Sequence, residues 1–224
     1  FIFMKTQILK PLYVPLFAGL LGSALLFTAC EQNKDSADVA KDQNDERFEN
    51  VNDDNNNNGV NNAAKVEQKD ADFVLKAANI DMAEIYVSRQ ALAKSNNAEV
   101  KRMAQMMVDE HTKTSEQLKS LATTHNISLP TEPSQDDVKN WKGLLDKTGA
   151  DFDKDYADWL VSTHKDAVDN FDDISKKEDY HPDIRNLATN TLPALRHHLT
   201  EAERLRDLLK GNNNNNNNNR SNNP

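Results

Sequence analysis

Four long stretches between residues 70 and 210 repeat apolar residues at alternating intervals of three and four. This spacing places the repeated residues on one face of an α-helix and leaves the other faces polar. The stretches cover residues 70–94, 97–126, 150–178 and 182–210. A helix with one apolar face has to bury that face against a neighbour, so the pattern predicts an all-α fold, a four-helix bundle over residues 70–210.

Local signals mark the helix ends and the connections. Asn96 followed by Glu99 has the spacing of a capping box, and Gly211 is a typical residue after a last helical turn. The connection over residues 126–150 is longer than a hairpin turn and predicts a short extra helix around residues 138–147. A segment of this length can also run along a whole bundle, so up-down and crossover topologies both remain open.

The start of the sequence has the pattern of a lipoprotein signal peptide. Two lysines are followed by an uncharged, mostly apolar run that ends at residue 29. The junction Leu26-Phe27-Thr28-Ala29-Cys30 resembles the lipobox of bacterial lipoproteins, in which the cysteine is lipidated and becomes the new N-terminus. We therefore expect residues 1–29 to be a signal peptide and Cys30, the only cysteine, to carry a lipid that anchors the chain without spanning the membrane.

Two polar segments flank the predicted bundle. Residues 30–69 are rich in Asn and Asp and poor in apolar residues, which predicts a disordered tether with a mean span of roughly 35 Å. Residues 211–224 contain a run of asparagines and predict a disordered tail.

Composition excludes several classes of function. The net charge of −9 argues against a nucleic-acid partner, which requires a basic face. The sequence contains no P-loop, no dinucleotide-binding glycine motif and no constellation for a catalytic nucleophile, so it does not identify an enzyme. The acidic outer faces permit protein contacts but specify no protein partner.

Each apolar face is interrupted once, near its midpoint, by an ionisable residue. Packing four helices of similar length side by side brings these midpoints to one level inside the bundle. The four interruptions are Glu84, His111, His164 and His198.

Three imidazoles and one carboxylate suit one transition-metal ion, Zn, Fe, Cu, Mn or Ni, better than Ca or Mg. A metal-free cluster, in which the carboxylate, the histidines and a water hydrogen-bond to one another, is the alternative. Asp81 and Glu201 lie one helical turn from members of the layer and are expected to act as outer partners. Glu110 is expected to be solvated, and surface roles are expected for the remaining histidines, His125, His181 and His197.

Several sequence blocks together resemble a known family. They are Phe73-Val74 with Ala77-Ala78 and Glu84-Ile85; Met107-Val108-Asp109-Glu110-His111-Thr112; Leu129-Pro130; Phe152-Asp153 with Tyr156, His164 and Phe171; and Leu192-Pro193 with Leu195 and His198-Leu199. Their order and spacing over residues 70–208 resemble the bacterial family called domain of unknown function 4142, with Glu110 in place of the Asp of its Met-Val-x-Asp-His block.

The resemblance implies a ferritin-like bundle in an exported or outer-membrane protein, here facing the periplasm, with no assigned biochemical role. Di-iron bundles use Glu-x-x-His pairs, but positions 108, 161 and 195 hold Val, Val and Leu. A single ion is therefore expected, in metal handling or stress protection. The competing hypothesis is a metal-free structural or protein-interaction module of the envelope.

Overall fold

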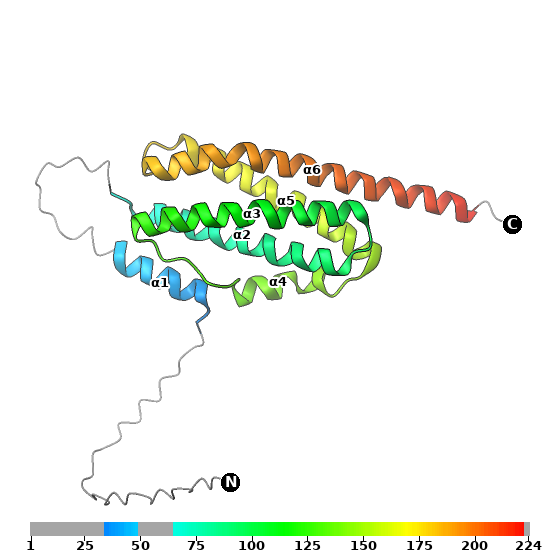
Figure 1. Ribbon diagram of the computed structural model, residues 1–224, viewed down its shortest axis with the longest axis horizontal. Coiled ribbons are helices and arrows are strands. Elements are labelled where there is room, and N and C mark those ends of the chain that lie inside the picture. The colour runs from blue at the N-terminus through cyan, green and yellow to red at the C-terminus, as the bar shows by residue number, and fades with distance from the viewer. Residues whose placement is uncertain (1–33, 49–64, 222–224) are drawn as a thin grey trace, which may run out of the picture. The chain divides into compact units, whose positions relative to one another are not determined.

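The computed structural model describes residues 34–48 and 65–221, and all regular structure within these ranges is helical (Figure 1). The predictions for residues 1–29 and for Cys30 lie outside the described residues. The helices are α1 (Ser36–Phe48), α2 (Gln68–Lys94), α3 (Ala98–His125), α4 (Gln135–Leu145), α5 (Gly149–Lys176) and α6 (Pro182–Ser221). The predicted all-α fold is confirmed, and α2, α3, α5 and α6 correspond to the four periodic stretches.

The four long helices follow a crossover topology, which the sequence left open. The backbone N–H of His181, just before α6, donates to Asp70 in the first turn of α2, so both helices begin at one end of the bundle. His125 in the last turn of α3 contacts Asp183 in the first turn of α6, so α3 ends there. Because a short loop joins α5 to α6, α5 ends there too. The segment between α3 and α5 must therefore return along the bundle, as in ferritin-like folds.

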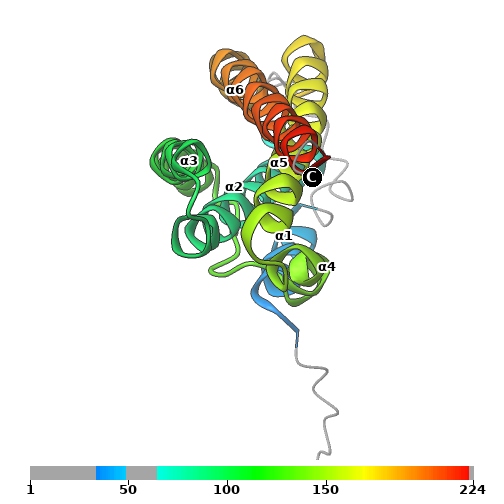
Figure 2. The ribbon, with the colours of Figure 1, turned by 90° about the vertical axis from the view of Figure 1, so that its right-hand side faces the viewer.

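α4 lies within this returning segment, close to where the short extra helix was predicted. Its first turn is capped by Ser134, whose Oγ accepts from the backbone N–H of Asp137 at 3.0 Å. The buried side chain of Trp141 anchors α4 through ring contacts with Tyr86 and Trp159. Figure 2 shows α4 and α1 on the same side of the bundle.

The N-cap of α3 lies one residue later than predicted. The side chain of Asn97 accepts hydrogen bonds from the backbone N–H groups of Glu99 and Val100, at 2.9 and 3.3 Å. The capping box predicted at Asn96 and Glu99 is therefore wrong, because the second of two adjacent asparagines is the one that reaches the free N–H groups of the first turn.

The predicted apolar faces form the core. Most of their residues are buried, and a few near the edges of the faces are half-buried. The core consists of two apolar clusters. One contains Phe73, Leu118, Phe171 and Ile184 near the end where α3 and α5 finish, and the other contains Met103, Phe152, Leu160 and Leu205.

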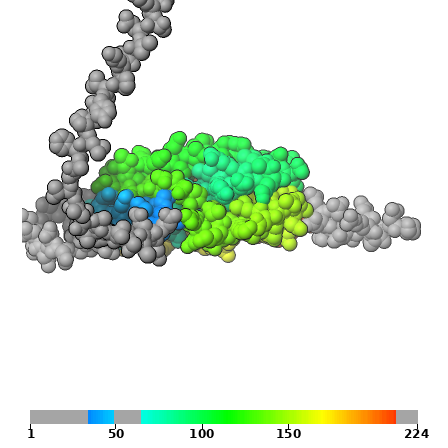
Figure 3. Space-filling view, turned by 90° about the horizontal axis from the view of Figure 1, so that it is seen from below, coloured from blue at the N-terminus to red at the C-terminus, as the bar shows by residue number. Residues whose placement is uncertain are grey.

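The predicted tether contains a helix, so that part of the prediction is wrong. The side chain of Asp35 accepts from the backbone N–H groups of Ala37 and Asp38 and starts α1. Asn44 of α1 is fully buried; its Nδ2 donates to the carbonyl oxygen of Ser128 at 3.0 Å and its Oδ1 accepts from the N–H of Ser128 at 2.7 Å. Figure 3 shows α1 (blue) against the chain that follows α3 (green). Polar contacts to backbone hold this helix in place together with the buried side chains of Ala40 and Phe48.

The C-terminal helix also continues past its predicted end. α6 extends to Ser221, although the sequence predicted a stop at Gly211 and a disordered tail. A single glycine inside a helix costs only about 1 kcal/mol relative to alanine, and no proline follows before residue 224. Among the described residues, no helix combines the length and apolar character needed to cross a membrane.

Candidate metal centre

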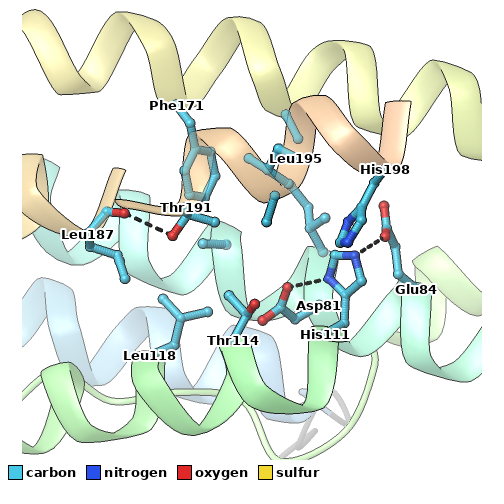
Figure 4. A pocket seen from close by; sticks show the side chains of 14 residues that line it. Asp81, Glu84, His111, Thr114, Leu118, Phe171, Leu187, Thr191, Leu195 and His198 are labelled. Carbon is cyan, nitrogen blue, oxygen red and sulfur yellow. Dashed lines mark hydrogen bonds and ion pairs between the residues drawn. The ribbon is translucent and has the colours of Figure 1, made fainter. Parts of the chain in front are cut away.

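The structure brings the four interrupting residues together. Glu84 of α2, His111 of α3, His164 of α5 and His198 of α6 are all at most 3% exposed. Figure 4 shows Glu84, His111 and His198 side by side at one end of a pocket. Each long helix contributes one residue, and the four residues meet because each lies near the middle of its helix.

The imidazole of His111 is held from outside the layer by a carboxylate. Its Nδ1 lies 2.8 Å from Oδ1 of Asp81, whose other oxygen accepts from Ser115 Oγ at 3.3 Å. An ionised carboxylate can only accept, so Nδ1 donates and Nε2 is the nitrogen that faces the layer. That Nε2 atom lies 2.7 Å from Oε2 of Glu84 (Figure 4).

The imidazole of His164 is held by the backbone of its own helix. Its Nδ1 lies 3.0 Å from the carbonyl oxygen of Leu160, one turn earlier. A carbonyl oxygen can only accept, so Nδ1 donates and Nε2 carries the lone pair. That Nε2 lies 3.3 Å from Oε2 of Glu84 and 3.2 Å from Nδ1 of His198.

The imidazole of His198 is held by Glu110, for which the sequence predicted a solvated position. Nε2 of His198 lies 2.7 Å from Oε2 of Glu110. Burial raises the pKa of Glu110, but the hydrogen bond from His198 outweighs this effect and lowers the pKa, so Glu110 is ionised at neutral pH. His198 therefore donates through Nε2 and presents the lone pair of Nδ1 to the layer.

The partners outside the layer thus leave two lone pairs facing each other, on His164 Nε2 and His198 Nδ1, at 3.2 Å. One of the two rings would have to carry a second proton to turn this contact into a hydrogen bond. Burial lowers the pKa of both histidines, to about 4 for His198, so neither ring holds that proton at neutral pH. A cation between the two nitrogens resolves the contact.

The spacing of the donor atoms fits such a cation. A tetrahedral ion with bonds of about 2.05 Å separates neighbouring donors by about 3.3 Å. The contacts at His164 measure 3.2 and 3.3 Å, and the contact between His111 and Glu84 is shorter, at 2.7 Å. The donor nitrogens of the three histidines all lie within 4.8 Å of one another, so the three residues could hold a metal ion.

The contact between Glu84 and His111 is close but lacks the alignment of a hydrogen bond. Both oxygens of Glu84 and Nε2 of His111 are buried without a hydrogen-bond partner of suitable geometry among the described residues. A buried carboxylate in this state is costly unless an opposite charge accompanies it. This is the arrangement expected where the two groups share a metal ion.

The ionisation of the same pair shows which charge compensates Glu84 in the metal-free chain. Burial lowers the pKa of His111, but Glu84 and Asp81 outweigh burial and raise it to about 10. Burial raises the pKa of Glu84, but the imidazoles of His164 and His111 outweigh burial and lower it to about 2. A metal ion would therefore replace a proton on His111.

The two predicted outer partners have different surroundings. Asp81 contacts His111, although it was placed next to Glu84 by sequence spacing. Glu201 binds Arg102 of α3 at 2.7 Å and Arg204 of its own helix at 3.3 Å, in a surface network of ion pairs. The expectation that Glu201 orients a histidine of the layer is wrong, because the arginine of the neighbouring helix takes its carboxylate.

A small pocket adjoins the layer and is lined by residues of all four long helices. Its volume is about 20 Å³, enough for about one water molecule. The walls are mostly apolar and include Leu118, Phe171 and Leu195 (Figure 4). The layer is therefore screened from bulk solvent on this side.

The chain belongs to the family described as domain of unknown function 4142, whose sequence profile matches residues 55–205. The match covers the four long helices up to the part of α6 that contains the layer. No curated protein and no solved structure gives a significant match to the chain.

Proposed function

We propose that this chain is a lipid-anchored protein of the bacterial cell envelope whose bundle holds one transition-metal ion. The ligands are Glu84, His111, His164 and His198, and the ion is Zn, Fe, Cu, Mn or Ni. Four donors from the chain complete the shell of a tetrahedral ion and leave no open position. Such a shell favours holding a metal, in metal handling or stress protection, over catalysis at the metal.

The observation that carries the proposal is the set of hydrogen bonds around the three histidines. Each ring donates outward, to Asp81, to the carbonyl of Leu160 or to Glu110. These partners fix each ring so that its other nitrogen faces the layer, as the outer partners of metal-binding histidines do. In the metal-free chain the inward nitrogen of His111 carries a proton, but the contact between His164 Nε2 and His198 Nδ1 has none, and a metal ion would satisfy both.

The anchor rests on the sequence of the junction at Cys30 and on the position of α1. If Cys30 carries the lipid, α1 begins only six positions later, at Ser36. The five residues between them span at most about 18 Å, even when fully extended. The proposal therefore places the bundle close to the membrane, on the periplasmic side of the outer membrane.

Metal analysis of the full chain tests the proposal. The protein is extracted from membranes in detergent, purified without a histidine tag and analysed by mass spectrometry for all five metals. The test variant is His164→Gln, which removes one ligand without a large change in volume. The matched control is His197→Ala, because His197 is exposed and lies next to a proposed ligand.

We expect the His164→Gln chain to contain about one equivalent of metal less than the wild type, and the His197→Ala chain to match the wild type. Circular dichroism checks that all three are folded. A folded His164→Gln chain with the wild-type metal content contradicts the assigned ligands. A wild-type chain that takes up no ion, even after incubation with each metal, supports the metal-free envelope module.

A further inference from the structure

A second group of potential metal ligands lies at the end of the bundle where α3 finishes and α6 starts. His125 is in the last turn of α3, His181 immediately precedes α6, and Asp183 is in its first turn. One donor atom from each lies within 4.8 Å of the other two. None of the three belongs to the buried layer, and the sequence predicted only surface roles for both histidines.

The two histidines flank one carboxylate oxygen. Oδ2 of Asp183 lies 2.9 Å from Nε2 of His125 and 3.8 Å from Nδ1 of His181. The imidazole rings pack edge to face, with their centres 4.7 Å apart. The histidine side chains are only 14% and 9% exposed, whereas that of Asp183 is 50% exposed. The cluster is thus walled by imidazoles and open to solvent at the carboxylate.

Backbone contacts hold this arrangement in place. The backbone N–H of His181 donates to Oδ1 of Asp70 at 2.9 Å, which fixes the loop before α6. α3 is capped by Asn126, whose left-handed backbone (φ 56°) lets the N–H of Ile127 bond back to the carbonyl oxygen of Ala122 at 2.8 Å. Ligands held this way lose little conformational freedom when an ion binds.

The hydrogen bonds also show which nitrogen of His181 carries a lone pair. Nδ1 of His181 accepts a bond of 3.2 Å from the backbone N–H of Asp183, so this nitrogen is unprotonated. An ion would displace that bond, and the freed N–H, at the exposed start of α6, can be hydrated. The negative end of the α3 helix dipole, next to His125, further favours a cation.

We propose that His125, His181 and Asp183 form a second, solvent-facing site for a divalent transition-metal ion. Two imidazoles and one carboxylate are the ligands that Zn, Ni, Co, Cu and Fe(II) accept, and they are a poor set for Ca or Mg. The chain supplies three donors here, so water completes the coordination and the ion exchanges with solvent. The site does not depend on the buried layer.

Zinc binding to the full chain in detergent tests the site. The chain is stripped with a chelator, dialysed against Zn²⁺, and the bound ions are counted. Asp183→Asn removes the ligand charge but keeps the shape, and His125→Ala/His181→Ala removes both imidazoles. His197→Ala is the matched control, because it deletes the one histidine outside both clusters.

We expect two ions per chain in the wild type and in the control, with the more weakly held ion lost from the double variant. Its affinity should fall more than about 100-fold in the double variant, since removing a group that merely orients a ligand already costs about 10–100-fold. The His164→Gln chain should lose the buried ion and keep the surface ion. Loss of the buried site is thereby distinguished from loss of the surface site. Wild-type zinc content in the double variant would overturn the proposal.

Paramagnetic broadening in the unmodified chain supplies a measurement that does not depend on how the variants fold. In a chain first loaded with one equivalent of Zn²⁺, which fills the more tightly binding buried layer next to His197, added Ni²⁺ should broaden the imidazole NMR signals of His125 and His181 at lower concentration than the signal of His197. Equal broadening of all three signals would contradict a specific site.

Discussion

Replacing Glu110 by alanine should weaken metal binding although Glu110 is not a proposed ligand. Its carboxylate accepts the Nε2–H of His198 at 2.7 Å and so keeps the lone pair of Nδ1 facing the layer. A hydrogen bond to an ionised group contributes about 1.5–3 kcal/mol. Because the side chain of Glu110 is 38% exposed, solvent screens the interaction, and we take about 1–2 kcal/mol.

That free energy corresponds to a loss of about 5–30-fold in metal affinity. The assay is competition for Zn²⁺ against a chelator of known affinity, at neutral pH, with the full chain in detergent. The matched control is Asp109→Ala, which removes the same charge from the neighbouring, exposed position. Equal affinities in the Glu110→Ala chain and the wild type, or an equal loss in the Asp109→Ala chain, would refute the role given to Glu110.

Three further predictions concern pH, the N-terminal helix and the anchor. The metal-free chain should lose about 2–3 kcal/mol of unfolding free energy, measured with urea, as the pH falls from about 6.5 to about 4. Burial lowers the pKa of His198 to about 4 in the folded chain, so in this window the unfolded chain binds a proton that the folded chain does not. An unfolding free energy independent of pH in this window would contradict that pKa. Asn44→Ala removes both hydrogen bonds to Ser128. Amide hydrogen exchange should then become faster in α1 and around Ser128, with the rest of the bundle unchanged. Unaltered exchange in α1 would show that other contacts hold this helix. The mature wild-type chain should be heavier than residues 30–224 by the mass of the lipid and Cys30→Ser should lack that added mass; an added mass that persists in Cys30→Ser, or is absent from the wild type, would exclude Cys30 as the lipid anchor.

The periodicity of the sequence was sufficient to predict the polar layer and the fold class. Each interruption of an apolar face is a residue that the helix must bury, and helices of equal length align their midpoints. Neither step requires knowing which helices are neighbours, so periodicity alone places Glu84 and the three histidines in one buried layer, where the structure has them.

Contacts between helices could not be read in the same way. Glu110 is 100° around α3 from His111, so periodicity assigned it to solvent, yet its side chain reaches His198 on α6. The prediction for Glu201 was wrong because Arg102 on the neighbouring helix binds its carboxylate. The available signal for Glu110 was the acidic residue directly before the histidine in the family's sequence block.

The topology and the N-terminal helix also could not be predicted from the sequence. The connection after α3 is long enough for two topologies, and only the contact between His125 and Asp183 shows which end α3 reaches. α1 contains few apolar residues, and Asn44 and the backbone of Ser128 help to dock it alongside the buried Ala40 and Phe48. An estimate based on apolar burial therefore predicted disorder for a segment that polar contacts help to hold.

Anomalous diffraction from crystals of the metal-loaded chain, recorded at the absorption edge of the bound ion, tests the proposed buried metal site most directly. We predict a peak about 2.0–2.2 Å from four atoms: a carboxylate oxygen of Glu84, Nε2 of His111, Nε2 of His164 and Nδ1 of His198. Ligation of His198 through Nδ1 is the specific consequence of its bond to Glu110. No peak within the layer, or an ion bound to Nε2 of His198, would contradict the proposed site.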